Sequence, residues 1–197
     1  MTEPNTIDDA VRELHLAVGE CILAWAAVEL SLANIFDIIQ QTDPAISHAV
    51  FGAVRSFEAR LKMIGDAFNV RFPDADRSPR DDWKRLYNYI SSSNAERNQV
   101  AHATMLIVGN KGPMLEPFFV MTAPKPYLST SDVQTRIVNF KELEQVLTWW
   151  FPERLRKIGK ARPPGFARQV PDLVLRLRDE AARSRAKQKP PRRSSPK

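Results

Sequence analysis

The segment whose residue types could do chemistry runs from Arg97 to His102 and reads RNQVAH. His102 can accept or donate a proton near neutral pH, because the unperturbed pKa of an imidazole is about 6.5. Arg97 carries a permanent positive charge on a planar group that suits the charge building up on phosphate oxygens. Together these side chains fit phosphodiester transfer on RNA, in which the histidine moves the proton of a ribose 2′-hydroxyl or of the leaving oxygen.

Helical spacing brings the polar side chains of this segment close together. Asn98 and His102 are four residues apart and share one face of a helix. Arg97 lies about 100° around the helix from Asn98, which is close enough to border the same cleft. Asn98 could orient the phosphate or the imidazole. We therefore expect Arg97, Asn98 and His102 to be the catalytic residues. We expect no metal and no cofactor, because the sequence has no His, Cys and Asp cluster with metal-ligand spacing.

Arg97 also lies on a row of its helix that is predicted to face the protein interior. The other members of that row are Trp83, Tyr87, Ile90 and Asn94. A buried guanidinium needs an anionic partner. Glu29, the one acidic residue in the second apolar stripe of the first predicted helix, is the expected partner, and Arg60 competes for it. The alternative is that Arg97 and Glu29 only lock two helices together, while His102 caps the end of a helix.

Helices must position these residues, because apolar residues recur along most of the chain at steps of three and four. The first helix is predicted from about Ile7 to Gln41. Its apolar seam consists of Leu14, Val18, Cys21, Trp25, Val28, Leu32, Ile35 and Ile39. The second helix is predicted to start with Asp43 as N-cap and Pro44 in the first turn. Its expected core face comprises Ile46, Val50, Ala53, Phe57, Leu61, Ile64 and Phe68.

Two further core helices are predicted. The third begins at residues 78–81, which resemble a capping box, and continues toward His102. The fourth is expected to begin with Asn139 as N-cap and Glu142 three residues later, and Pro152 is expected to kink it.

A β-hairpin is predicted between the third and fourth helices. Residues 104–108 and 115–122 have strand-like composition and are separated by a turn at 110–112. Pro117 restricts the second strand to a sheet edge. A short helix or turn is expected near Thr130. The fold class is therefore mainly α: a bundle of about four core helices with a small hairpin after the third, followed by a basic tail.

The positive charge of the chain belongs to its C-terminal part. The net charge is +6 overall, whereas residues 1–161 hold 18 Lys and Arg against 20 Asp and Glu, a net charge of −2. Residues 162–197 hold 11 Lys and Arg against 3 Asp and Glu. We predict one helical domain at 1–161 and a basic, Pro-rich, largely disordered tail at 162–197, with a short amphipathic helix at 172–187. This tail could bind RNA phosphates, an acidic membrane surface or a protein partner.

A cytoplasmic location is expected from three features. The single cysteine, Cys21, cannot form an internal disulfide. The N-terminal residues are acidic and polar, unlike a signal peptide. The most apolar stretch, residues 21–36, is interrupted by polar residues and is shorter than the roughly 20 residues of a membrane span. We therefore predict no transmembrane segment.

The Arg-Asn-x-x-x-His pattern at the end of a core helix resembles the signature of HEPN-domain proteins (higher eukaryotes and prokaryotes nucleotide-binding). Two more patterns, Trp25 with Glu29 and the segment from Ser56 to Leu61, are similar to a bacterial branch of that family. The resemblance covers about residues 8–161. It implies an all-helical bundle that pairs as a homodimer. In active members, Arg and His from both chains meet in one cleft and cut RNA without metal.

The function that this resemblance implies is a metal-independent endoribonuclease, acting as a toxin or a phage-defence effector. The residues carried over are Arg97, Asn98 and His102, with Glu29 and Arg60 in support. Many family members are noncatalytic, so the alternative is a helical dimerisation or interaction module, or a regulatory RNA-binding protein. The predicted hairpin directly after His102 departs from the simplest members and could cover the cleft or remodel the dimer.

Overall fold

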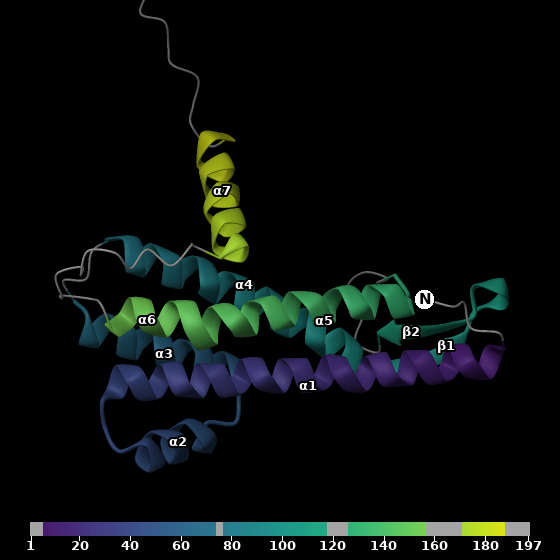
Figure 1. Cartoon of the computed structure of the whole chain (residues 1–197), viewed down its shortest axis with the longest axis horizontal. Helices are drawn as coiled ribbons and strands as arrows, with labels where there is room; N and C mark the ends of the chain where they lie inside the picture. Colours follow the sequence, from purple (N-terminus) through teal and green to yellow (C-terminus); the bar gives the residue numbers. More distant parts are fainter. Residues whose placement is uncertain (1–5, 74–76, 118–125, 157–170, 188–197) are drawn as a thin grey trace, which may run out of the picture.

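The computed structural model describes residues 6–73, 77–117, 126–156 and 171–187, and it is mainly α-helical (Figure 1). The longest element, α1 (Ile7–Gln40), begins where the Thr6 side chain accepts a hydrogen bond from the backbone N–H of Asp9. It ends at Gln41, which adopts a left-handed conformation with φ of 54°. One side of α1 is buried against α3, α4 and α5, as the apolar seam predicts.

The predicted second helix is two helices, α2 (Pro44–Ala53) and α3 (Phe57–Arg71). The prediction of one continuous helix was wrong because Ser56 is a second N-cap, whose hydroxyl accepts from the backbone N–H of Ala59. The expected core face is buried only in the part that belongs to α3. In α2, Ile46 and Val50 are 60% and 47% exposed rather than in the core.

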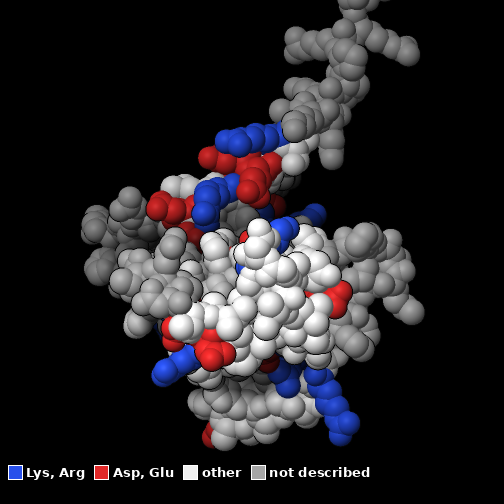
Figure 2. Space-filling model, turned by 90° about the vertical axis from the view of Figure 1, so that its right-hand side faces the viewer, with Lys and Arg blue, Asp and Glu red and all other residues white. Residues whose placement is uncertain are grey.

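The predicted third helix is α4 (Arg77–Ala101), and a β-hairpin follows it. Strands β1 (Ala103–Ile107) and β2 (Pro113–Pro117) pair antiparallel, with the short 3₁₀ turn η1 (Gly109–Lys111) between them. The hairpin and the mainly α fold class are thus confirmed. Figure 2 views the molecule from the hairpin end and shows mostly uncharged side chains at its centre.

The predicted start of the last core helix was wrong. Helix α5 (Thr130–Gln145) begins nine residues before Asn139, because Ser129 and Asp132 form a capping box. The chain continues through a π-helical turn, η2 (Val146–Trp150), into α6 (Phe151–Arg156). This irregular turn lies just before Pro152, where a distortion was expected, because proline removes a backbone donor from the helix.

The amphipathic helix predicted in the tail is present as α7 (Asp172–Lys187). Its first turn buries Leu173 and Val174, and Arg178 donates to both carboxylate oxygens of Asp82 on α4, at 3.0 and 2.7 Å. Beyond that contact the helix projects away from the bundle (Figure 1). The predicted domain boundary at 161 and the tail after residue 187 lie outside the described residues.

Helix α1 is the one helix among the described residues whose length and composition would allow it to cross a membrane. Its most apolar 18-residue window has a mean hydropathy of 1.7, and 39% of that window is buried inside the fold. A core helix passes the same test, and α1 supplies much of the core here. The absence of a membrane span and the cytoplasmic location therefore stay predictions.

Candidate functional site

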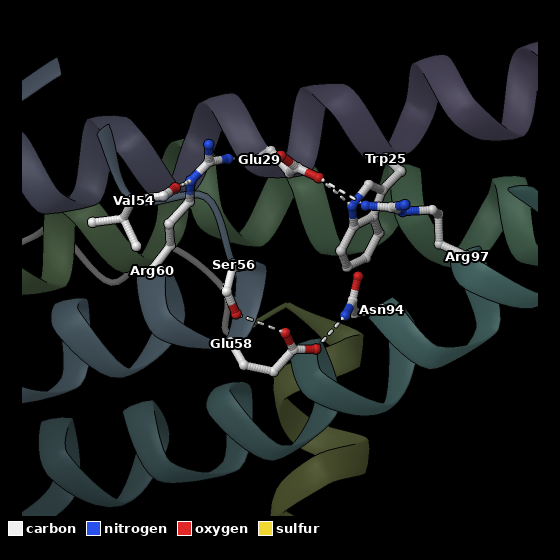
Figure 3. A network of polar contacts seen from close by, with 8 residues as sticks. All are labelled: Trp25, Glu29, Val54, Ser56, Glu58, Arg60, Asn94 and Arg97. Carbon is white, nitrogen blue, oxygen red and sulfur yellow. Dashed lines mark hydrogen bonds and ion pairs between the residues drawn. The ribbon is translucent and has the colours of Figure 1, made fainter. Parts of the chain in front are cut away.

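The carboxylate of Glu29 on α1 joins three helices at the candidate site (Figure 3). Its Oε1 accepts hydrogen bonds from Trp25 Nε1 at 2.7 Å and from Arg97 Nη2 at 3.2 Å. Its Oε2 accepts from Arg60 Nη1 at 3.2 Å. The sequence offered Arg97 and Arg60 as competitors for Glu29, whereas the structure places both on it at once, one on each oxygen.

Each guanidinium is also oriented by a neighbour other than Glu29. Arg97 lies over the ring of Trp25, with its Cζ 5.8 Å from the ring centroid. Arg60 lies over Phe51 at 5.4 Å, and its Nε donates to the backbone oxygen of Val54 at 2.6 Å. A cation over an aromatic face is attracted by the negative face of the ring. These contacts hold both arginines in place on two sides of one carboxylate.

The three charged side chains are not sealed from solvent. Arg60 and Arg97 are each 23% exposed, and Glu29 is 28% exposed. Two cations share one anion, so this triad carries one net positive charge. Within the described residues, Arg97 Nε is buried and makes no hydrogen bond. Because Nε is buried, an anion could reach only the exposed part of the Arg97 side chain.

A second carboxylate, Glu58 at the start of α3, lies on the same side of the bundle (Figure 3). It accepts hydrogen bonds from Asn94 Nδ2 at 2.9 Å and from the Ser56 hydroxyl at 3.2 Å. The sequence analysis missed Glu58, although its place in the first turn after the N-cap Ser56 could have indicated it. With Glu58 included, the wider polar group is electrically neutral, so any attraction for an anion depends on local geometry.

His102 lies at the opposite end of the motif from Arg97, just past the last residue of α4. Its backbone N–H donates to the backbone oxygen of Asn98 at 3.1 Å, and its side chain is exposed, while Asn98 is half-buried. Arg97 and His102 are five residues apart, which corresponds to about 7.5 Å along the axis of a helix. The structure thus brings Arg97, Arg60 and Glu29 together, and it places Asn98 farther from this group and His102 just past the end of α4.

A separate charged cluster surrounds Asp82 on α4, which is 2% exposed. Its carboxylate contacts Arg85 at 3.2 Å, Arg154 at 3.0 Å and Arg178 at 2.7 Å. The sequence analysis did not single out this cluster. The sequence signal for it is an acidic residue next to the core residue Trp83, with Arg85 three residues later on the same helix, whereas Arg154 and Arg178 come from distant parts of the chain.

Cys21 does not have the properties of a nucleophile. It is fully buried, and burial raises the pKa of its thiol to about 11. Among the described residues, no group of three or more His, Cys, Asp and Glu side chains is placed to hold a metal ion.

Comparisons of the chain with protein-family models, with curated proteins and with solved structures give no match. The resemblance at residues 97–102 therefore depends on the motif and its surroundings alone.

Proposed function

We propose that this protein is a metal-independent endoribonuclease in which Arg97 binds the scissile phosphate and His102 transfers a proton. The observation that supports this most is that Arg97 is oriented by Glu29 and Trp25 yet its side chain remains 23% exposed, so that part of it can be reached from solvent.

In the proposed reaction, the ribose 2′-oxygen attacks phosphorus and the 5′-oxygen leaves. One imidazole removes the proton of the 2′-hydroxyl, and a second group gives a proton to the leaving oxygen. Arg97 neutralises the charge that develops on the non-bridging oxygens, and Asn98 orients the phosphate or the imidazole. Because each chain offers one histidine at this position, we include a homodimer in the proposal, so that the second chain supplies the second proton-transfer group.

Cleavage of labelled RNA in the presence of EDTA tests this proposal. Wild type should cut RNA, and His102→Ala and Arg97→Ala should each lose about 10² or more in rate, the usual size of a general acid–base or charge-stabilising contribution. His48→Ala, which removes an exposed histidine from α2, is the matched control and should keep full activity. Equal cleavage by wild type and His102→Ala, or no cleavage of several RNAs by either, would refute the proposal.

The proposed biological role is that of a cytoplasmic toxin or phage-defence effector. Induction of the wild-type gene in a bacterial host should then arrest growth, while induction of His102→Ala should not. Growth arrest by both wild type and His102→Ala would mean that the toxicity does not depend on the proposed RNA cleavage.

The second candidate function is a noncatalytic interaction module, or a regulatory RNA-binding protein. The contacts of Glu29 with α3 and α4 favour it, because they join three helices in the manner of a structural lock. Under this function, His102→Ala would leave any RNA binding unchanged. Arg97→Ala would have a lower melting temperature than wild type, and neither protein would cut RNA.

A further inference from the structure

A cavity of about 810 Å³ lies between α1, α2 and α3, near the C-terminal end of α1. Figure 1 shows α2 beside α1, apart from the other helices. Phe36 and Ile39 of α1 supply buried apolar lining, while Ile46 and Val50 of α2 and Val70 of α3 supply exposed apolar lining. Cavities of about 300–1,000 Å³ with mostly apolar linings are typical of small-molecule sites. A ligand here would remove the exposed apolar side chains from water.

The cavity is open because α2 is attached at one point and because α3 carries small side chains opposite it. Phe51 anchors α2, since its ring packs on Phe36 of α1 with the centroids 5.8 Å apart. On α3, Ala59 and Ala67 line the cavity. Larger residues at these two positions would fill the space between α2 and α3.

The polar side chains along most of the cavity already bond to one another. The buried Ser47 hydroxyl and the Thr42 hydroxyl are hydrogen-bonded at 2.9 Å. Lys62 Nζ donates to the carboxylate of Asp66 at 2.6 Å, one turn farther along α3. The body of a ligand therefore needs no hydrogen-bonding groups of its own, which favours a hydrocarbon.

Arg71 gives the cavity one uncompensated positive charge. It lies in the last turn of α3 and is exposed, and among the described residues its side chain donates to the uncharged side chain of Gln41. Lys62 and Asp66 cancel each other, so the charged lining residues sum to one positive charge. A complementary ligand has an apolar body and one anionic end.

We propose that this cavity binds a free fatty acid, with the hydrocarbon chain between α2 and α3 and the carboxylate on Arg71. A guanidinium binds a carboxylate through two parallel hydrogen bonds, which a glutamine side chain cannot offer. From Ala59 to Val70 the cavity follows α3 for about 16 Å, the length of an extended acyl chain of about 12–14 carbon atoms. A peptide helix of that length is about 10–12 Å wide and would exceed the volume of the cavity.

Isothermal titration calorimetry with laurate, at concentrations below micelle formation, tests the site. Wild type should bind a single laurate per chain. From octanoate to laurate the affinity should rise roughly fourfold for each added methylene, because each one is buried against the apolar lining. Chains much longer than the cavity should gain nothing further. Binding that does not saturate, or an affinity that is independent of chain length, would overturn the proposal.

The charge of Arg71 is tested by changing both the protein and the ligand. Arg71→Gln should weaken laurate binding about tenfold, since it removes a charged hydrogen-bond donor, and it should leave the binding of dodecanol unchanged. Arg12→Gln is the matched control, because Arg12 is an exposed arginine near the start of α1 and does not line the cavity. Equal laurate affinity in the two variants would refute the assignment of the carboxylate to Arg71.

Ile46→Asp tests the apolar part of the site. Ile46 is 60% exposed, so the variant should fold, and it should bind laurate at least about tenfold more weakly because it places a negative charge beside the ligand. Val138→Asp, at a 64% exposed position on α5, is the matched control and should bind as wild type does. Full laurate affinity in Ile46→Asp would overturn the proposal. A wild type that binds no laurate but forms a dimer that Ile46→Asp separates would overturn it in favour of a second copy of the chain.

The fatty-acid site does not depend on the proposed ribonuclease activity. Its lining comes from α1, α2 and α3 and from the short link between α1 and α2, and it includes neither Arg97 nor His102. Saturable laurate binding by a chain that cuts no RNA would therefore support the site and refute only the proposed function.

Discussion

Removing the charge of Glu29 tests whether this residue is the anionic centre of the candidate site. Glu29→Gln keeps the size of the side chain and an acceptor for Trp25 Nε1, but it removes the negative charge from two ion pairs of 3.2 Å. Two guanidinium groups would then lie near each other with no carboxylate between them.

The size of the effect follows from the exposure of these groups. Exposed ion pairs contribute about 0.2–1 kcal/mol each, whereas breaking a fully buried pair costs about 3–5 kcal/mol. The three side chains are 23–28% exposed, between these limits. We expect Glu29→Gln to destabilise the fold by about 2 kcal/mol, which lowers the melting temperature of a chain of this size by roughly 4–8 °C.

Thermal unfolding followed by circular dichroism measures this change. Glu20→Gln is the matched control, because Glu20 is on the same helix and pairs with Lys141, while both side chains are more than half exposed. It should stay within about 0.5 kcal/mol of wild type. Added sulfate should stabilise Glu29→Gln more than wild type, since the freed guanidinium groups would bind it in the folded state. A Glu29→Gln melting temperature equal to that of the Glu20→Gln control would refute the reasoning.

Three further predictions concern other parts of the fold. Asp82→Ala should cost about 3 kcal/mol, because it removes a buried carboxylate that three half-buried arginines contact. Limited proteolysis should cut α7 faster once Arg178 has lost its partner. Cys21, with its pKa raised by burial to about 11, should react with Ellman's reagent at pH 8 only after unfolding. Hydrogen bonds from Ser129 hold the pKa of Asp132 below its usual value. Asp132 therefore contributes stability at neutral pH that is lost as pH falls through its lowered pKa, and Asp132→Asn should show a smaller loss of melting temperature on acidification.

The course of α1 and α4 was predictable because both follow one apolar period without interruption. The helix break at Ser56 was not predicted, since the apolar spacing continues across it from Ala53 to Phe57. The hydrogen bond that the Ser56 hydroxyl accepts from the backbone N–H of Ala59 decided the outcome there. The start of α5 was predicted too late for a similar reason, because Asn139 and Ser129 both begin a capping pattern. The earlier start is the one that buries Val133 and Ile137 in the core.

The contact between Arg97 and Glu29 was predictable because each is the one charged residue on a row that is predicted to face the interior. The simultaneous contact of Arg60 was not, since helix periodicity does not say how two neighbouring helices are rotated about their axes. The cluster around Asp82 could not be predicted from the sequence either, because its side chains come from three helices, α4, α6 and α7. Such a contact depends on long-range packing rather than on local spacing.

The role of Arg60 in the proposed function leads to one more prediction. When RNA draws Arg97 away, Glu29 keeps two donors, Trp25 Nε1 and Arg60 Nη1, so no carboxylate is left without a partner. Without Arg60, Arg97 would be the only cation on Glu29, and its transfer to a phosphate would leave the carboxylate without a counter-charge.

Arg60→Met should therefore weaken RNA cleavage, although Arg60 is assigned no contact with the substrate. Loss of stability alone would also reduce activity, so the informative variant is the double substitution Arg60→Met with Glu29→Gln. The neutral amide introduced by Glu29→Gln no longer holds Arg97, and cleavage should rise above that of Arg60→Met even though the double variant lacks both ion pairs. A double variant that is less active than Arg60→Met would mean that Arg60 only supports the fold, because the release of Arg97 would then bring no gain.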